Sequence, residues 1–310
     1  MNTPVTRRSF LAGSGVLVAG ASLPMAEAVA RPQATTAPGA EPRPRSIRKA
    51  VKLGMVAGGG SVLEKFQLLA ALGYDGVEVD SPSDLDPDEV LAARDATGLV
   101  IHGVVDSAHW RSPLSDPTET VRARGRAALE TALGDCRRYG GSTVLLVPAV
   151  VNKRVSYAEA YERSQTQIKR VLPLAEEHGV AIAIENVWNN FLLSPLEAAR
   201  YVDELESPSI GWYLDVGNIV NYGWPEQWVR TLGRRILKLD IKEYSRRKRD
   251  DEGLWKGFDV EIGEGDCDWP AVMAALDAIG YVGWATAEVR GGDAARLKEI
   301  AARMDRVLKK

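Results

Sequence analysis

The chain has 310 residues, of which 45% are hydrophobic and 26% are charged, and its formal net charge is −3. This composition is typical of a globular protein with one sizeable core. The weakly acidic balance gives no support for binding to nucleic acid or to an anionic membrane surface. Cys136 and Cys267 are not spaced like metal ligands, which favours two buried thiols over a zinc site, with a disulfide as the alternative in an oxidising compartment.

The first 30 residues have the features of an export signal. Arg7 and Arg8 lie in the twin-arginine pattern TRRSFL, an apolar run follows, and small residues at 26–30 offer cleavage sites. We expect a twin-arginine signal peptide at 1–30 and a periplasmic or secreted mature protein that does not enter the membrane. A frayed N-terminal helix is the alternative. The Pro-, Ala- and Arg-rich stretch 31–47 is predicted to be a disordered linker, which leaves 48–310 as the folded domain.

From residue 51 onward, short apolar runs typical of buried strands alternate with helical patterns, many of which end at a glycine. Eight strand–helix units in about 260 residues predict a single-domain α/β fold, the (β/α)8 TIM barrel. An open doubly wound sheet is the rival fold, but the glycines at 58–60 fit neither the dinucleotide nor the P-loop spacing. The expected strands are 51–55, 76–79, 99–105, 143–148, 180–185, 212–215, 236–239 and 284–287, and the expected helices are 61–72, 87–97, 118–139, 156–178, 195–205, 225–232, 269–279 and 293–308.

The last four predicted strands all lead into a carboxylate: Glu185, Asp215, Asp240 and Glu288. Active sites of such barrels lie at the carboxyl ends of the strands, so we expect the four groups to converge at one mouth of the barrel. Carboxylates that converge repel one another unless a cation or protons neutralise them. An oxygen-only ligand set favours one divalent ion of the harder kind, Mn²⁺, Mg²⁺ or Co²⁺, over zinc. The alternative is that each carboxylate pairs with a lysine or arginine across a loop.

Four segments of this chain are similar to a known family, the sugar isomerases and epimerases with a xylose-isomerase-like barrel, and in particular to L-ribulose-5-phosphate 3-epimerases. They are 185–195 (ENVWNNFLLSP), 213–218 (YLDVGN), 225–228 (PEQW) and 280–284 (GYVGW). The resemblance implies one divalent metal held by Glu, Asp, His and Glu. Glu185, Asp215 and Glu288 match three of these ligands. The histidine of the family motif is replaced here by Asp240, which adds one negative charge to the ligand set.

The resemblance also implies a reaction in which a proton leaves the carbon beside a ketose carbonyl and an enediolate forms. Glu185 and Glu288 would be the acid–base pair on opposite faces of the substrate. Arg246 stands at the position of a family arginine that holds substrate oxygens. Asn218 stands where many relatives have a substrate-contacting histidine.

Further substrate contacts are predicted from the residues themselves. If Val100 faces the inside of the barrel, His102, two residues later, also faces inward, and His109 lies in the loop that follows. Each histidine is interpreted either as a substrate contact or as an ordinary histidine whose hydrogen bonds are made within the protein. Trp188 either stacks on a sugar face or belongs to the core. Lys242 shares the face of Asp240 and is the remaining substrate-binding candidate. The charged run 246–251 is interpreted as a solvated loop, with phosphate binding or a lid as the alternatives.

We interpret the chain as a metal-dependent epimerase or isomerase of a ketose or keto-sugar, and the expected export argues against a phosphorylated substrate. One alternative is a lyase that cleaves 3-keto-glycosides after the same proton abstraction. Another is a sugar-binding barrel with a degenerate metal site and no catalysis. DNA-repair endonucleases of related fold need a multi-zinc centre, and three histidines are too few for it. A homo-oligomer is compatible with the sequence, which does not determine the oligomeric state.

Overall fold

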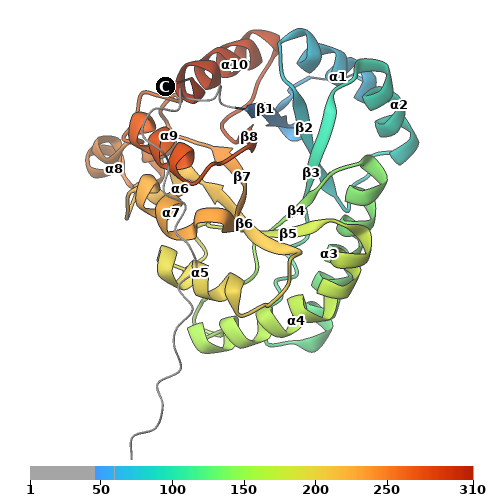
Figure 1. Cartoon of the computed structure of the whole chain (residues 1–310), viewed down its shortest axis with the longest axis vertical. Helices are drawn as coiled ribbons and strands as arrows, with labels where there is room; N and C mark the ends of the chain where they lie inside the picture. Colours follow the sequence, from blue (N-terminus) through green and yellow to red (C-terminus); the bar gives the residue numbers. More distant parts are fainter. Residues whose placement is uncertain (1–45, 59, 310) are drawn as a thin grey trace, which may run out of the picture. The chain divides into compact units, whose positions relative to one another are not determined.

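The computed structural model of the chain describes residues 46–58 and 60–309. The predicted signal peptide and most of the predicted linker therefore lie outside the described residues. Within them, eight parallel strands close into a barrel in chain order (Figure 1). This confirms the predicted (β/α)8 barrel. The strands are β1 (Ile47–Lys52), β2 (Gly76–Ser81), β3 (Val100–Asp106), β4 (Thr143–Leu146), β5 (Ala181–Glu185), β6 (Ile210–Asp215), β7 (Ile236–Ile241) and β8 (Gly283–Ala287).

Helices connect the strands and surround the barrel (Figure 1). Local sequence sets several of their ends: Ser156 and Glu159 form a reciprocal capping box at the start of α4, and α2, α3 and α4 stop at Gly98, Gly140 and Gly179 in the left-handed conformation. The helices are α1 (Val62–Ala71), α2 (Pro87–Thr97), α3 (Glu119–Tyr139), α4 (Tyr157–His178), α5 (Pro195–Asp203), α6 (Val216–Val220), α7 (Pro225–Leu232), α8 (Arg246–Glu252), α9 (Trp269–Ala278) and α10 (Ala294–Leu308), with 3-10 turns η1 (Leu53–Met55), η2 (Gly233–Arg235) and η3 (Leu254–Phe258).

Alternation along β5 separates the two layers of the core. Ile182 and Ile184 are fully buried in the large apolar cluster between strands and helices. Ala183 belongs to a separate, small cluster with Leu145 and Tyr213. Because successive strand residues point to opposite faces, Glu185 follows Ala183 into the barrel, as the sequence predicted.

The first strand differs from its expected position. The sequence predicts a strand at 51–55, but β1 covers Ile47–Lys52, and Leu53–Met55 forms a 3-10 turn. Ile47 therefore belongs to the barrel and not to the linker. On one side of β1, Val51 pairs with Ala287 of β8. The following residue, Lys52, consequently lies at the mouth of the barrel, where the four carboxylates also lie.

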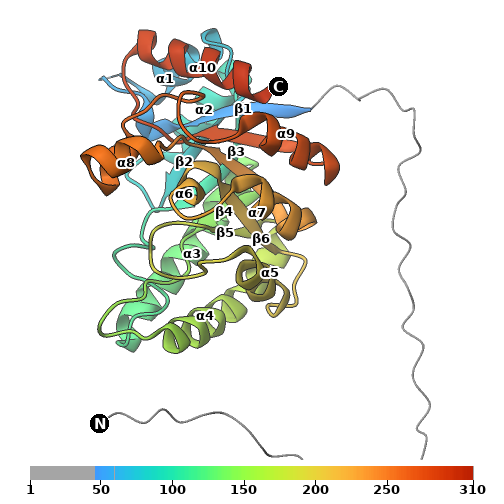
Figure 2. The same cartoon turned by 90° about the vertical axis from the view of Figure 1, so that its left-hand side faces the viewer.

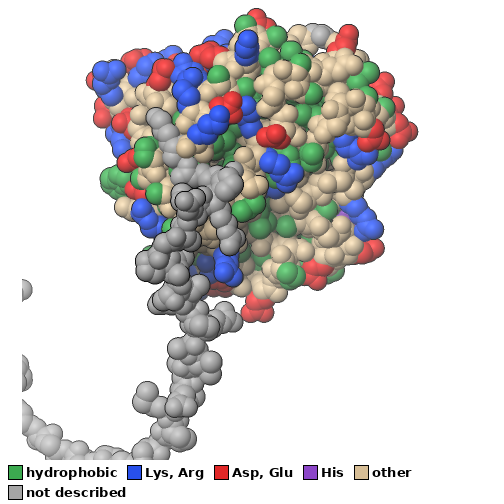
Figure 3. All heavy atoms as spheres, turned by 45° about the horizontal axis from the view of Figure 1, so that its top comes forward, with side chains coloured by type: hydrophobic (Ala, Val, Ile, Leu, Met, Phe, Trp, Pro, Cys, Tyr) green, Lys and Arg blue, Asp and Glu red, His purple; other side chains and the backbone are tan. Residues whose placement is uncertain are grey.

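The surface agrees with the balanced composition. Acidic and basic side chains are interspersed over the face drawn in Figure 3. In Figure 2, α8 projects from the barrel at the left. Cys136 and Cys267 are both buried free thiols, which confirms the interpretation from their spacing. Among the described helices, none combines the length and the apolar character that crossing a membrane requires.

Candidate metal centre and active site

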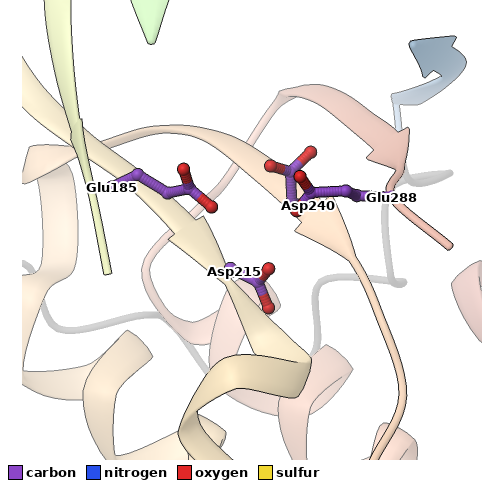
Figure 4. A group of neighbouring side chains, drawn as sticks. All are labelled: Glu185, Asp215, Asp240 and Glu288. Atoms are coloured by element: carbon purple, nitrogen blue, oxygen red, sulfur yellow. The ribbon is translucent and has the colours of Figure 1, made fainter. Parts of the chain in front are cut away.

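Four strand ends bring four carboxylates together. Glu185 ends β5, Asp215 ends β6, Asp240 lies one residue before the end of β7, and Glu288 directly follows β8. Asp215 and Asp240 are register partners in neighbouring strands, and the backbone N–H of Glu288 donates to the carbonyl of Ile241 at 3.1 Å. One ligand oxygen from each side chain lies within 4.8 Å of the others (Figure 4). We call these four residues the carboxylate cluster.

The members of the carboxylate cluster differ in burial and in charge state. Asp215 and Asp240 are fully buried, and Glu185 is 6% exposed. Burial, and after it the neighbouring Glu288, raise the pKa of all three above the ordinary carboxyl range, to about 6 for Asp215. Glu288 behaves oppositely: burial alone raises its pKa, but Lys242 and Lys52 outweigh burial and hold the pKa below the usual range.

Two lysines bridge the carboxylate cluster. The Nζ of Lys52 lies 3.0 Å from Asp240 Oδ2 and 2.9 Å from Glu288 Oε1. The Nζ of Lys242 lies 2.9 Å from Asp215 Oδ2 and 2.9 Å from Glu288 Oε2. Lys242, which was predicted to bind substrate, carries part of the counter-charge. Lys52 was not among the residues singled out from the sequence.

The donor set fits a divalent cation. Asp240 Oδ1 is buried and accepts no hydrogen bond from the described residues, and the buried oxygens Asp215 Oδ2 and Glu288 Oε2 contact the ammonium group of Lys242. Four carboxylates and two ammonium groups leave a formal charge of −2 in a buried space, which one divalent ion neutralises. Oxygen ligands alone are typical of Mg²⁺, Mn²⁺ or Co²⁺. Glu185, Asp215, Asp240 and Glu288 are thus the residues that would hold the ion.

Amide side chains fix the position of Asp215. Asn186 accepts from the backbone N–H of Asp215 at 3.0 Å and donates to its carbonyl at 2.7 Å. The backbone N–H of Asn218, in the first turn of α6, donates to Asp215 Oδ1 at 2.7 Å. The Asn218 side chain in turn donates to the carbonyl of Asn186 at 3.0 Å. Because both amides are committed to the strand ends, they hold the ligand carboxylate in one orientation.

Glu243 orders the loop that follows β7. Its buried carboxylate accepts from the indole of Trp269 at 2.8 Å, from the backbone N–H of Gly263 at 2.8 Å and from that of Cys267 at 3.0 Å. Without this carboxylate, the three N–H groups would have no acceptor. Glu243 therefore supports the site through the fold of the 263–269 loop.

We expect Glu243→Gln to lower the free energy of unfolding by about 2–4 kcal/mol, because the amide NH₂ faces donors and several charge-assisted hydrogen bonds are lost. Urea denaturation followed by tryptophan fluorescence measures the change. Glu252→Gln, on the exposed end of α8, is the control and should shift the midpoint little. A Glu243 variant as stable as this control would contradict the role assigned to the carboxylate.

A cavity of about 1270 Å³ opens above the carboxylate cluster. Glu185 and Glu288 line it, whereas Asp215 and Asp240 lie beneath its surface. One wall is aromatic: Trp188 packs against Trp255 and Phe258, with ring centroids 4.9 and 4.8 Å apart. Apart from Glu185 and Glu288, the charged lining residues are Lys52, Asp80, Asp106, Lys242, Glu243, Asp259, Glu261, Arg290 and Arg296.

Asn218, His109, Trp188 and Lys242 line this cavity, so the structure places four of the six predicted substrate-binding residues beside the carboxylate cluster. The Nδ1 of His109 accepts from the backbone N–H of Val147 at 3.3 Å. Burial lowers the pKa of His109 to about 3, which keeps its ring neutral. Trp188 donates from its indole to the carbonyl of Asn218 at 2.9 Å.

His102 and Arg246 do not line the cavity. His102 is buried inside the barrel, where its ring stacks on Trp284, meets the Nζ of Lys238 at 2.9 Å and lies 3.1 Å from Thr286 Oγ1. Arg246 begins α8 and donates to the carbonyls of Val220 and Gly223 at 2.9 and 2.8 Å. In this structure both side chains support the fold, and neither reaches the space in which a substrate would lie.

The charged run 246–251 was expected to be a solvated loop and forms α8 instead. Ser245 caps the helix by accepting from the backbone N–H of Lys248. Arg246 and Arg249 tie it to the segment after β6: Arg249 donates to the carbonyl of Asn221 at 2.9 Å. These intramolecular hydrogen bonds explain why the run forms a helix rather than a solvated loop. They cannot be predicted from the periodicity of the sequence.

Asp106 ends β3 in the cavity wall and accepts from the backbone N–H of Ala108 at 2.9 Å. Burial raises the pKa of Asp106 to about 6. Below about pH 4 its carboxyl is protonated in both the folded and the unfolded chain, so its burial then costs nothing. As pH rises through 6, the folded protein must hold an ionised, buried carboxylate, and stability is lost.

Asp106→Asn should therefore raise the free energy of unfolding by roughly 2–3 kcal/mol at pH 7.5 and leave it unchanged near pH 4. The asparagine oxygen keeps the hydrogen bond from Ala108. Denaturation midpoints of both proteins at the two pH values measure the effect. An asparagine variant less stable than the unmodified protein at pH 7.5 would show that the charge of Asp106 is compensated in the fold.

The sequence from residue 66 to residue 310 matches the family model described as the xylose isomerase-like TIM barrel. The chain belongs to this family. L-ribulose-5-phosphate 3-epimerase UlaE from Escherichia coli O157:H7 (strain EC4115 / EHEC) is 26% identical over 262 residues, which cover 78% of this chain and 89% of that protein. The predicted family is therefore confirmed.

Solved structures of similar fold include two further sugar epimerases. The D-allulose 3-epimerase from Methylomonas sp. superposes with a TM-score of 0.69 at 19% identity and covers 86% of this chain and 98% of that one. The 3-keto-D-glucoside 4-epimerase YcjR from E. coli has a TM-score of 0.69 at 17% identity and covers 84% and 98%. At these identities the two structures support the fold, and all three named relatives are isomerases, the predicted class of enzyme.

Proposed function

We propose that this member of the xylose isomerase-like TIM barrel family is a divalent-metal-dependent epimerase or isomerase of an unphosphorylated ketose or keto-sugar. One observation carries the proposal. Glu185 and Glu288 reach the cavity from different strands, with two fully buried carboxylates directly beneath them. That arrangement offers both a cation site and two proton-transfer groups where a substrate would lie.

The two glutamates are suited to opposite halves of a proton exchange. Burial raises the pKa of Glu185, whereas Lys242 and Lys52, outweighing burial, keep the pKa of Glu288 low. Glu288 is thus the more readily ionised of the two, which assigns it the part of the base and Glu185 the part of the acid. Glu288 takes the proton from the carbon beside the carbonyl, and Glu185 returns a proton to it. A divalent ion held by the carboxylate cluster would supply Lewis-acid stabilisation of neighbouring sugar oxygens.

The charges around the cavity support an unphosphorylated substrate. Seven acidic and four basic residues line it. Lys52 and Lys242 are committed to the carboxylate cluster, and Arg296 pairs with Glu261 at 2.7 Å and Glu299 at 2.9 Å. A dianionic phosphate would meet more repulsion than attraction here. The aromatic wall offers flat apolar surface to the C–H face of a sugar ring.

The expected export of the protein supports the same choice of substrate, because the twin-arginine pattern at residues 6–11 points to a compartment in which free sugars and glycosides occur. Export itself remains a prediction from the sequence. Fractionation of cells that produce the protein, with Arg7→Lys and Arg8→Lys as the transport-deficient control, tests it.

A second candidate is elimination from a 3-keto-glycoside. The cavity of about 1270 Å³ exceeds the roughly 300–1,000 Å³ typical of small-molecule sites, so it has room for a sugar ring and a further group. The fold neighbour YcjR acts on a 3-keto-D-glucoside, according to its name. The same proton abstraction would here be followed by loss of the aglycone, so the products distinguish the two reactions.

Deuterium exchange tests the proposal. The protein, loaded with Mn²⁺, is incubated in D₂O with unphosphorylated ketoses and with 3-keto-glycosides, and the products are examined by NMR and mass spectrometry. An epimerase gives deuterium at the inverted carbon, and an eliminating enzyme releases the aglycone. Absence of exchange with every keto-sugar, from a protein that binds Mn²⁺, would favour the non-catalytic sugar-binding barrel.

A further inference from the structure

We propose that Lys52 is the positioning residue that balances the charge of Asp240 and thereby sets the affinity of the carboxylate cluster for its divalent ion. This inference rests on the proposed function in one respect, namely that the carboxylate cluster binds a divalent ion. It assigns a role to a residue outside the ligand set.

The contacts of Lys52 are specific to the carboxylate cluster. Its Nζ lies 3.0 Å from Asp240 Oδ2 and 2.9 Å from Glu288 Oε1, and its side chain is 17% exposed. Asp240 is fully buried. Its other oxygen, Oδ1, accepts no hydrogen bond from any described residue. Among the ion pairs of the described chain, the contact with Lys52 is the one that involves Asp240.

A buried carboxylate needs this kind of partner. An isolated charge in a low-dielectric interior costs several kcal/mol, which an ammonium group at contact distance offsets. Asp240 with Lys52 carries no net charge, so Oδ1, which accepts no hydrogen bond from the described residues, is left for the ion without adding to the negative charge of the carboxylate cluster. Lys242 plays the corresponding part for Asp215, at 2.9 Å from Oδ2.

The position of Lys52 follows from the strand register. Val51 pairs with Ala287, so the next residues, Lys52 and Glu288, lie side by side where β1 and β8 end. The strand Ile47–Lys52 stops at this residue, and the chain then turns through η1. The ammonium group is therefore fixed at the mouth of the barrel by the backbone of a core strand.

The charge balance predicts opposite effects for two substitutions. Lys52→Met removes a cation that repels the metal ion, so Mn²⁺ should bind at least about tenfold more tightly. Asp240→His replaces an anionic ligand by a neutral one beside the same lysine, so Mn²⁺ should bind at least about tenfold more weakly. The double variant has the formal charge of the unmodified carboxylate cluster, and its affinity should return to within about threefold of the original.

Isothermal titration with Mn²⁺ measures the four affinities, with no need for a substrate. Lys49→Met is the matched control: Lys49 lies on the same strand and pairs with Asp305 at 2.9 Å, away from the carboxylate cluster. Its loss should leave Mn²⁺ affinity unchanged. Thermal unfolding of each variant checks that it is folded. If Lys52→Met alone unfolds, the comparison of the double variant with Asp240→His still measures the contribution of Lys52.

The outcomes separate the two proposals. Opposite shifts that cancel in the double variant support the charge-balancing role of Lys52. Unchanged or weaker Mn²⁺ binding on removal of Lys52, in either background, would overturn it while leaving the metal-dependent function intact. Failure of the unmodified protein and of every variant to bind Mn²⁺ would overturn both.

Discussion

Glu185→Gln should lower the rate of deuterium exchange at the substrate carbon by about 10³–10⁴-fold, because the variant keeps a ligand oxygen but has no group that exchanges a proton. Glu288→Gln should have an effect of the same size. Both side chains line the cavity directly above the buried part of the carboxylate cluster. The measurement is wash-in of solvent deuterium, followed by NMR, at saturating Mn²⁺ and substrate.

The control for both substitutions is Glu261→Gln. Glu261 lines the same cavity and pairs with Arg296 at 2.7 Å, but it does not belong to the carboxylate cluster. Its loss should change the exchange rate less than about tenfold. Equal rates for Glu185→Gln and this control would show that Glu185 transfers no proton, and the acid–base pair would have to be reassigned.

Removal of the metal is expected to lower turnover of a keto-sugar by at least about 10³-fold, because the negative charge that develops on the sugar oxygens then lacks a Lewis acid. Dialysis against a chelator followed by a turnover assay measures the loss. Added Mn²⁺ should restore activity, whereas added Zn²⁺ or Ca²⁺ competes for the same carboxylates with different preferred geometry. Undiminished turnover after complete removal of metal, verified by elemental analysis, would mean that the lysines alone stabilise the charge.

The barrel was predictable because its evidence is local and repeated. Most strands are short runs rich in apolar residues, and glycines such as Gly98 and Gly140 end the helices in a conformation that other residues adopt at a cost. The convergence of the four carboxylates followed from one topological rule, since parallel strands of a closed barrel end at the same mouth. Both inferences needed only residue type and spacing along the chain.

Lys52 was missed because the position of β1 depends on contacts that are distant in sequence. An expected strand at 51–55 makes Lys52 an early strand residue, whereas the pairing of Ile47–Lys52 with β8 places it at the carboxyl end. The signal was the sequence VKLGM, in which a glycine that permits a turn stands two residues after the lysine. Periodicity alone does not decide where such a strand begins.

The misplaced substrate contacts have a similar explanation. His102 faces the inside of the barrel, as predicted. It lies deep in the barrel beside Lys238 and Thr286, so it contacts other side chains and does not reach the cavity. Arg246 follows β7 closely, yet the hydrogen bonds to Val220 and Gly223 turn its guanidinium away. The position of a residue along a strand predicts which face of the strand its side chain lies on. How deep that side chain lies in the barrel depends on tertiary contacts.

The metal content of the full chain tests the account most directly. We would measure the stoichiometry and affinity of Mn²⁺ for the unmodified protein, for Glu185→Ala and for Asp240→Ala, whose side chains belong to the carboxylate cluster. We expect one Mn²⁺ per chain and a loss of affinity of at least about 100-fold in each variant. An unmodified protein that is folded and binds no divalent ion would contradict it, and the two lysines would then be the permanent counter-charges of the site.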